Sequence, residues 1–161
     1  MAAVAPVTAS PKAPPPPPPP IVASAPARRF EIPDIDRHGG WVLERLQKVY
    51  KDKTPQQIVA FLRGAVYSNE TLFLYKEHGV ALAAIWHPHP LESKPIIQEV
   101  FVLAEPGYEA EAADFYDNIA EWARRQDIDT ILVEELSDVP HEAIKEKLGR
   151  VFTKTINFAK L

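Results

Sequence analysis

Apolar positions in the second half of the chain follow a strand, helix, strand pattern. Residues 95–104 (PIIQEVFVLA) and 130–136 (TILVEEL) are rich in β-branched and other apolar residues. Between them, residues 109–125 carry apolar side chains at helical spacing. A helix that joins two parallel strands forms a βαβ unit, whose crossover is almost always right-handed. The pattern therefore predicts an α/β (α+β) domain built around this unit.

The segment before this unit predicts an edge strand followed by two helices. Residues 30–35 (FEIPDI) predict a short edge strand, because proline is barred from a central one. Residues 37–40 (RHGG) predict a break, and the apolar spacing over residues 41–51 predicts a helix. A second helix is expected over residues 54–67, since Thr-Pro-Gln-Gln is a strong capping sequence.

A hairpin is expected just before the βαβ unit, and a helix and a strand after it. Residues 71–77 and 80–86 predict two strands joined at His78-Gly79, where glycine tolerates a positive φ. Residues 137–148 predict a short helix, and residues 150–161 a final strand. These elements complete a mixed central sheet flanked by helices.

Residues 1–33 differ from the rest of the chain in composition. They contain an unbroken proline run, Pro14–Pro20, and no glycine. Proline fixes φ and has no N–H group, so we expect an extended polyproline II arm of about 3.1 Å per residue. One interpretation is a disordered tail, and the other is an arm that docks on protein partners. The domains are thus predicted as an arm, 1–33, and a folded domain, 34–161. The candidate partner-binding residues of the arm are Pro14, Pro17, Pro20, Arg28 and Arg29.

The net charge of −4 is unevenly distributed along the chain. Residues 1–33 hold Lys12, Arg28 and Arg29 against Glu31, which gives +2, so the remaining residues carry −6, which is −4 minus 2. Binding to nucleic acid depends on clustered Lys and Arg, so this balance argues against a nucleic-acid partner.

Composition also limits the kinds of covalent link and metal site, and the cellular location, that we expect. The chain has no cysteine, which excludes disulfides and thiolate metal sites. His87 and His89 lie in a proline-bounded loop without a neighbouring acidic ligand, so no metal site is predicted. No apolar run approaches the roughly 18 residues of a membrane span. The N-terminus lacks a basic and an apolar signal region, so we expect a protein that is not secreted by a signal peptide.

The predicted order of elements resembles the GCN5-related N-acetyltransferase (GNAT) fold over residues 30–161. In that family the strands that match residues 95–104 and 130–136 splay apart, and acyl-CoA lies in the gap. A signature of Gln or Arg, two residues, Gly, one residue, then Gly or Ala precedes the long helix, and its N–H groups hold the pyrophosphate. Laid on this chain, the signature falls on Gly107–Ala112 (GYEAEA).

The match to this signature is partial. Ala112 fits the last position, but Gly107 stands in place of Gln or Arg and Ala110 in place of the first Gly. The side chain of Ala110 restricts close approach of the backbone, and the carboxylates of Glu109 and Glu111 oppose a diphosphate.

The resemblance also implies site residues. If CoA binds, the residues that would hold it are Val102, Leu103, Gly107, Ala110 and Ala112. If the domain is active, Glu99 on the central strand is the candidate general base, and His141 at the start of the last helix is the nearest candidate acid.

Two functions stay open from the sequence. The first is a non-catalytic GNAT-like structural or assembly protein without cofactor, anchored to protein partners by its arm. Small GNAT-like proteins of this kind occur in tailed bacteriophages, and the C-terminal run SDVPHEAIKEKLGRVFTKTINFAKL is similar to them. That resemblance implies a symmetric assembly in the virion or the host cytoplasm, with no membrane. The alternative is an acetyl-CoA-dependent N-acetyltransferase with a divergent pyrophosphate loop.

Overall fold

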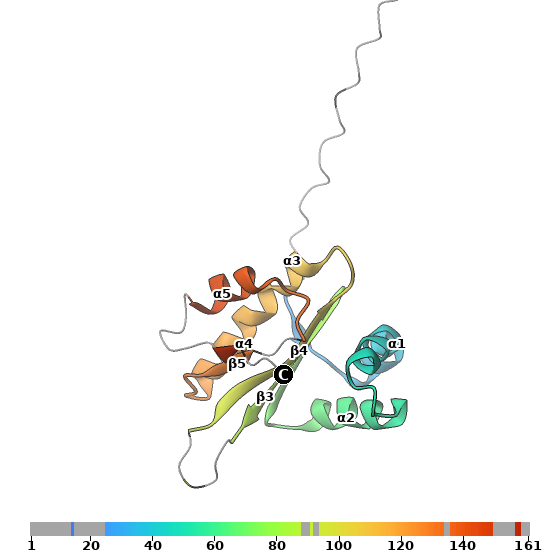
Figure 1. Cartoon of the computed structure of the whole chain (residues 1–161), viewed down its shortest axis with the longest axis horizontal. Helices are drawn as coiled ribbons and strands as arrows, with labels where there is room; N and C mark the ends of the chain where they lie inside the picture. Colours follow the sequence, from blue (N-terminus) through green and yellow to red (C-terminus); the bar gives the residue numbers. More distant parts are fainter. Residues whose placement is uncertain are drawn as a thin grey trace, which may run out of the picture.

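A computed structural model describes Pro14, residues 25–87, Leu91, residues 94–133 and 136–149, and the backbone of Asn157–Phe158. In these residues the chain forms a six-stranded mixed sheet in the order β1-β2-β3-β4-β5-β6, with helices on both faces (Figure 1). The predicted mixed sheet flanked by helices is therefore confirmed. The strands are β1 (Arg28–Arg29), β2 (Thr71–Lys76), β3 (Gly79–Trp86), β4 (Ile96–Ala104), β5 (Ile131–Val133) and β6 (Asn157–Phe158).

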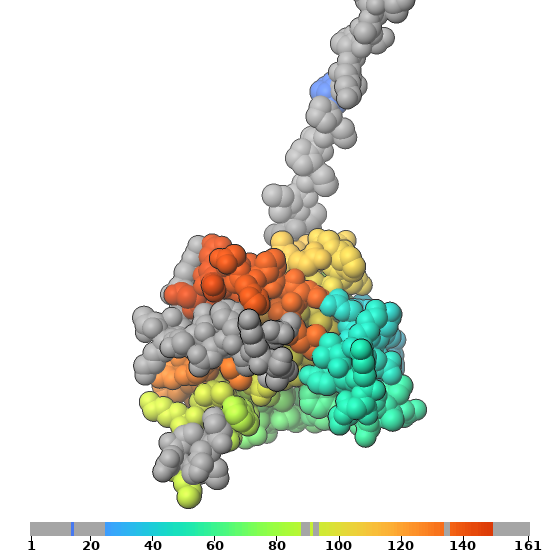
Figure 2. Space-filling model, in the orientation of Figure 1, coloured from blue at the N-terminus to red at the C-terminus, as the bar shows by residue number. Residues whose placement is uncertain are grey.

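Two groups of helices cover the two faces of the sheet. The cluster of buried residues around α1 and α2 lies on one face, and the cluster around α3, α4 and α5 lies on the other. In the space-filling view, the residues of α1 and α2 lie together at the right side of the molecule (Figure 2). The helices are α1 (Ile32–Val49), α2 (Pro55–Tyr67), α3 (Glu109–Ala112), α4 (Asp114–Arg125) and α5 (His141–Gly149).

The strand connections agree with the predicted βαβ unit. Strands β1 to β4 pair antiparallel with their neighbours, and β4 pairs parallel with β5. The chain between β4 and β5 runs through α3 and α4, which is the predicted crossover. The predicted hairpin of β2 and β3 is also confirmed, with Lys76 opposite Gly79.

The reason for the glycine in this hairpin differs from the one expected. Gly79 does not have a positive φ; among the described glycines only Gly107 does, at 93°. A Cβ at Gly79 would instead lie 3.1 Å from both the carbonyl oxygen of Leu103 and the ring of Phe115. Glycine is needed here because the neighbouring strand and α4 pack too closely for a side chain.

The predicted edge strand over residues 30–35 is wrong. The edge strand is β1, two residues long, and α1 already begins at Ile32. Glu31 and Asp34 form a reciprocal capping box, with a proline in the first turn, and this arrangement starts a helix. Arg28 binds Asp34 through two hydrogen bonds of 2.7 Å, so β1 is tied to α1.

The predicted break at residues 37–40 is also wrong, because α1 continues through both glycines. Glycine disfavours a helix interior by about 1 kcal/mol relative to alanine. Tertiary contacts offset this cost: the Nε2 atom of His38 lies 2.8 Å from the hydroxyl of Tyr75 on β2, and Val42 and Leu46 are buried against the sheet.

Two later elements differ in extent from the predictions. The predicted helix over residues 109–125 is divided into α3 and α4 at Ala113. Most of the predicted final strand over residues 150–161 lies outside the described residues. Within that range the structure describes β6, whose backbone pairs parallel with β5.

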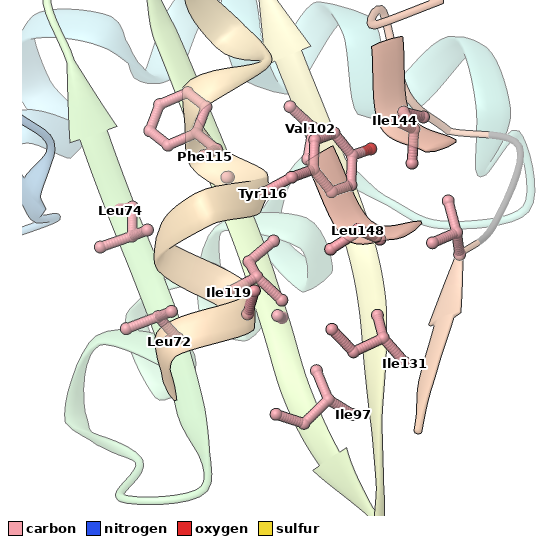
Figure 3. Close-up of a cluster of buried hydrophobic side chains, with 14 of the residues drawn as sticks. Leu72, Leu74, Ile97, Val102, Phe115, Tyr116, Ile119, Ile131, Ile144 and Leu148 are labelled. Carbon is pink, nitrogen blue, oxygen red and sulfur yellow. The ribbon is translucent and has the colours of Figure 1, made fainter. Parts of the chain in front are cut away.

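The core on the α4 side of the sheet is filled by large side chains that are fully buried (Figure 3). Phe115, Tyr116 and Ile119 project from α4 toward the strands, and Ile144 and Leu148 reach the same cluster from α5. Because each such side chain contributes roughly 1.5–3 kcal/mol on burial, this layer holds α4 firmly over β4.

Candidate functional site

The candidate site lies along β4, where the GNAT resemblance puts the gap between β4 and β5. The first half of β4 pairs with β5 through Ile97 and Gln98. The pairing of β4 with β3 then shifts register: Ala83 lies opposite Glu99, but Leu82 lies opposite Phe101. Val100 is thus an extra residue on β4, and such a bulge locally twists a strand.

Beyond this bulge, the segment 136–138 takes the place of β5 beside β4. The Val102 N–H donates to the Leu136 carbonyl (3.1 Å), and the Asp138 N–H donates to the Val102 carbonyl (2.9 Å). The Ala104 N–H donates to the Asp138 carboxylate (2.8 Å). We call residues 136–138 the closing segment, because they bind the backbone groups of β4 that would line an open gap.

The closing segment is also bound to α1, which lies on the opposite face of the sheet from α4. The second oxygen of Asp138 forms an ion pair with Arg45 of α1. One carboxylate therefore joins α1, β4 and the loop that leads into α5. Because both partners are partly buried, the pair is screened less than a surface ion pair.

A buried polar cluster lies next to the closing segment. Glu99 on β4 and Tyr116 on α4 are both fully buried. The Tyr116 hydroxyl lies 2.7 Å from the hydroxyl of Ser137, which also accepts a hydrogen bond from the Val139 N–H (3.2 Å). Burial raises the pKa of Tyr116 far above its usual value, and the charge of Glu99 adds to the effect. Tyr116 is therefore a neutral hydroxyl at neutral pH.

The loop between β4 and α3 is folded tightly against the β2–β3 turn. Gly107 has a φ of 93°, which favours glycine. The His78 Nδ1 lies 2.7 Å from a carboxylate oxygen of Glu105, and the His78 ring stacks on Tyr108 with 3.8 Å between ring centres. The role of Gly107 is thus to give the positive φ of the turn between β4 and α3.

The start of α4 carries carboxylates that are paired with lysines. Asp114 accepts hydrogen bonds from Lys76 (3.1 Å) and Lys147 (3.2 Å), and Lys147 also binds Asp117 (2.6 Å). Burial disfavours ionisation of Asp114, but the two lysines outweigh it and lower its pKa. The lysines of this region are thus already bound by the chain's own carboxylates.

The two predicted catalytic residues differ in burial. Glu99 is fully buried beside Tyr116, whereas His141 is an exposed residue at the start of α5. A general base must reach its proton directly or through one water, and a fully buried Glu99 has no open path to an amine in this conformation.

The predicted CoA-binding residues lie along β4 and α3. Both backbone groups of Val102 are bound to the closing segment, and Leu103 is fully buried in the core of the α1–α2 side. Gly107 shapes the turn, Ala110 is exposed, and Ala112 is buried.

Among the predicted partner-binding residues, Pro17 and Pro20 lie outside the described residues and Pro14 is exposed. The Arg28 guanidinium binds Asp34 and lies 4.2 Å from the centre of the Tyr75 ring, so Arg28 has a structural role. Arg29 is exposed at the edge of the sheet. Arg29 borders an open groove of about 500 Å³ between β2 and α4. The residues that line this groove include Leu72, Leu74 and Trp122.

Sequence reasoning missed Tyr116, Arg45 and Asp138. Tyr116 follows Phe115 in the apolar stripe of the α4 region, and a tyrosine in a buried stripe needs a partner for its hydroxyl. That pattern could have indicated a polar contact in the core. Asp138 falls within the short helix predicted over residues 137–148, and nothing in its local sequence indicates a bond to β4.

Metal sites and membrane-spanning helices are both absent from the described part of the chain. No group of three or more His, Cys, Asp or Glu residues is arranged to hold a metal ion there. No helix in that part is long and apolar enough to cross a membrane.

No protein-family model matches the sequence, and no curated protein matches it either. The fold, however, is similar to solved structures of two acetyltransferases. One is the aminoglycoside antibiotic 6'-N-acetyltransferase AAC(6')-Ih from Acinetobacter baumannii, at 14% identity and a TM-score of 0.54, covering 84% of this chain and 97% of that one. The other is AAC(6')-IG from Acinetobacter haemolyticus, at 14% identity and a TM-score of 0.55, covering 85% and 99%. The chain therefore has a GNAT-like fold.

The residues along β4 do not fit an acyl-CoA lying between β4 and β5. Such a ligand would compete with Leu136 and Asp138 for the backbone groups of Val102 and Ala104. Its diphosphate would also meet Glu109 and Glu111, which lie in the first turn of α3. A like charge nearby costs about 1 kcal/mol even in a high dielectric, and more when water is excluded.

Proposed function

We propose that this protein is a GNAT-like domain without acetyltransferase activity that acts as a structural or assembly protein. In this role it binds protein partners, and its proline-rich N-terminal arm is the anchor. The setting we propose, from the sequence resemblance alone, is a symmetric assembly such as the virion of a tailed bacteriophage.

One observation carries the proposal: the closing segment binds β4 where an acyl-CoA would have to lie. Two backbone hydrogen bonds, the bond from the Ala104 N–H to the Asp138 carboxylate and the Arg45–Asp138 ion pair would have to break to open this gap. Each hydrogen bond contributes about 0.5–1.5 kcal/mol, so opening would consume several kcal/mol of cofactor affinity. A fold is retained more readily than an activity, and a closed gap is compatible with a scaffold.

A second candidate is an acetyl-CoA-dependent N-acetyltransferase, favoured by the similarity to two aminoglycoside N-acetyltransferases over nearly their whole length. In this case the closing segment would have to release β4 when acetyl-CoA binds. Glu99 would then be freed for proton transfer, and an amine of the kind that those enzymes acetylate would be the acceptor.

Calorimetric titration of acetyl-CoA into the full chain separates the two candidates. The scaffold proposal predicts no binding and no acetyl transfer to an aminoglycoside. Micromolar binding together with turnover that is lost in Glu99→Gln would overturn the proposal in favour of the enzyme.

The role of the arm needs a separate deletion. Arg28 is paired with Asp34 and β1 pairs with β2, so the deletion should end at residue 24. We expect the variant that lacks residues 1–24 to keep its thermal midpoint and to lose incorporation into the partner complex. Normal incorporation without these residues would refute the arm as an anchor.

A further inference from the structure

The outer face of α2 exposes aromatic side chains that nothing in the described structure covers. Phe61 is 51% exposed and Tyr67 is 76% exposed. They lie beside Ala60, Arg63 and Gly64, which are also exposed. We call these five residues the α2 face. Large exposed apolar side chains that are grouped together mark interaction surfaces.

The small residues Ala60 and Gly64 of the α2 face leave room for another backbone to approach closely. Ala60, Gly64 and Tyr67 follow the i, i+4, i+7 spacing and so form one stripe along the helix. A Cβ at Gly64 would meet no atom within 4 Å, so packing within the chain does not require glycine there. Glycine is a poor helix former, and its position between two exposed aromatic residues suits a partner helix that packs on this stripe.

The charge of the α1–α2 layer indicates the chemistry of the partner. Residues 32–67, which span α1 and α2, contain six basic and four acidic residues, a net of +2, in a chain whose total is −4. Helix α2 itself contains no acidic residue and carries Arg63 on its exposed face. Within the layer, Glu44 pairs with Lys48 and Asp52 with Lys53, while Asp34 and Arg45 pair with Arg28 and Asp138 outside it. Arg37, Lys51 and Arg63 therefore outnumber Asp36 among the charged residues of the layer that form none of these ion pairs.

A second copy of the chain fits this surface less well. Residues 105–125 are acidic, with six carboxylates against two arginines, and would complement the α1–α2 layer by charge. However, α4 exposes no large apolar side chain in the described structure that could meet Phe61 and Tyr67. A better complement has acidic and apolar side chains on one helix.

We propose that the α2 face is a docking site for an acidic amphipathic helix of a partner protein. The apolar side of that helix packs on Phe61, Gly64 and Tyr67, and its carboxylates face Arg63 and the basic residues of the layer. This inference deepens the proposed assembly function, on which it rests, and it adds a second contact besides the arm.

The test is a titration of the isotope-labelled full chain with a synthetic helical peptide, followed by NMR. The peptide has Leu along one helical face and Glu at the other positions, and a matched peptide has Lys in place of Glu. We expect only the Glu peptide to bind, with shifts confined to α2 and weaker binding at high salt. No binding, equal binding of the Lys peptide, or shifts on another element would overturn the proposal.

Variants locate the site and control for helix stability. Gly64→Gln adds a side chain over the stripe and should weaken binding at least about tenfold. Gly40→Gln is the matched control, because Gly40 is also an exposed helical glycine with nothing within 4 Å of its Cβ position, and it should leave binding unchanged. Phe61→Ser should also weaken binding. Equal binding by Gly64→Gln and Gly40→Gln would refute the site.

Two further outcomes would assign the surface to another occupant and so overturn the proposal. One is a dimer in sedimentation that Gly64→Gln dissociates, and the other is displacement of the peptide by a single-stranded oligonucleotide. None of these measurements involves acetyl-CoA, so failure of the docking site is distinguishable from failure of the non-catalytic function.

Discussion

The helix layers on the two faces of the sheet differ in how far their aromatic side chains are buried. On the α4 side, Phe115 and Tyr116 are fully buried, and the Tyr116 hydroxyl is bonded to Ser137. On the α1–α2 side, Phe61 and Tyr67 are largely exposed. Both faces of the sheet bury a core. The difference is that α2 exposes large aromatic side chains, whereas the described helices α3, α4 and α5 expose none.

The candidate site of this chain also differs from the site of the GNAT enzymes whose fold it shares. In a GNAT enzyme the gap beside β4 is where the acyl-CoA lies. In this chain the closing segment binds that half of β4, and a carboxylate of the segment is fixed by Arg45. In our proposals, the binding surface of this chain is the outside of α2 and not the gap beside β4.

The largest difference between the two faces is expected in stability. Ile119 is fully buried under α4, so Ile119→Ala should lower the free energy of unfolding by about 2–5 kcal/mol. The exposed Phe61 is the matched position on the other face, and Phe61→Ala should change stability by only about 0.5 kcal/mol. Urea denaturation measures both, and equal losses would contradict the contrast between the two helix layers.

A smaller loss is expected when the closing segment is cut from β4. Asp138→Ala removes the acceptor of the Ala104 N–H and the partner of Arg45, which should cost about 1–3 kcal/mol. Asp36→Ala, which changes an exposed carboxylate on α1, is the control and should cost little. If both variants have the same unfolding midpoint, Asp138 does not hold the segment in place.

The buried hydroxyl of Tyr116 should contribute less than the Asp138 carboxylate. Tyr116→Phe keeps the ring but removes the bond to Ser137, so we expect a loss of about 1 kcal/mol. Tyr67→Phe, on the exposed face, is the control and should be neutral. Thermal denaturation gives the comparison, and a Tyr116→Phe variant as stable as the control would show that the polar cluster adds nothing.

The smallest effect is expected for Asp34 and should appear only in acid. Hydrogen bonds from Arg28 lower the pKa of Asp34, so its contribution is present above the usual value near 3.8 and is lost as the pH falls through the lowered value. Because Arg28 is 46% exposed, solvent screens the pair, and the contribution is about 1 kcal/mol. The stabilities of the wild type and Asp34→Asn should therefore converge at low pH. A constant difference down to the acid limit would contradict this assignment.

Much of the sheet and its central crossover could be predicted because the signals are local. Each of these signals lies within one segment of the chain. They are the β-branched and apolar run of β4, the helical stripe of α4 and the Thr-Pro-Gln-Gln start of α2. The start of α1 was missed although its signal was also local. Glu31 and Asp34 around a proline form a capping box, but the apolar residues beside them were interpreted as a strand.

The candidate site could not be predicted to the same degree, because its bonds join distant parts of the chain. Val102 and Asp138 are 36 residues apart, and Arg45 and Asp138 are 93 residues apart, from 138 − 102 and 138 − 45. The local sequence predicts only a short helix around Asp138. Only the fold shows that its carboxylate instead binds β4, and that Glu99 faces Tyr116 in the core.

Hydrogen exchange at the amides of Val102, Ala104 and Asp138, with and without acetyl-CoA, tests most directly whether the gap beside β4 is closed. The closed gap predicts that all three amides exchange slowly, as bonded core groups do, and that acetyl-CoA changes none of their rates. Fast exchange of these amides, or a change in their protection when acetyl-CoA is added, would contradict the closure on which the non-catalytic function rests.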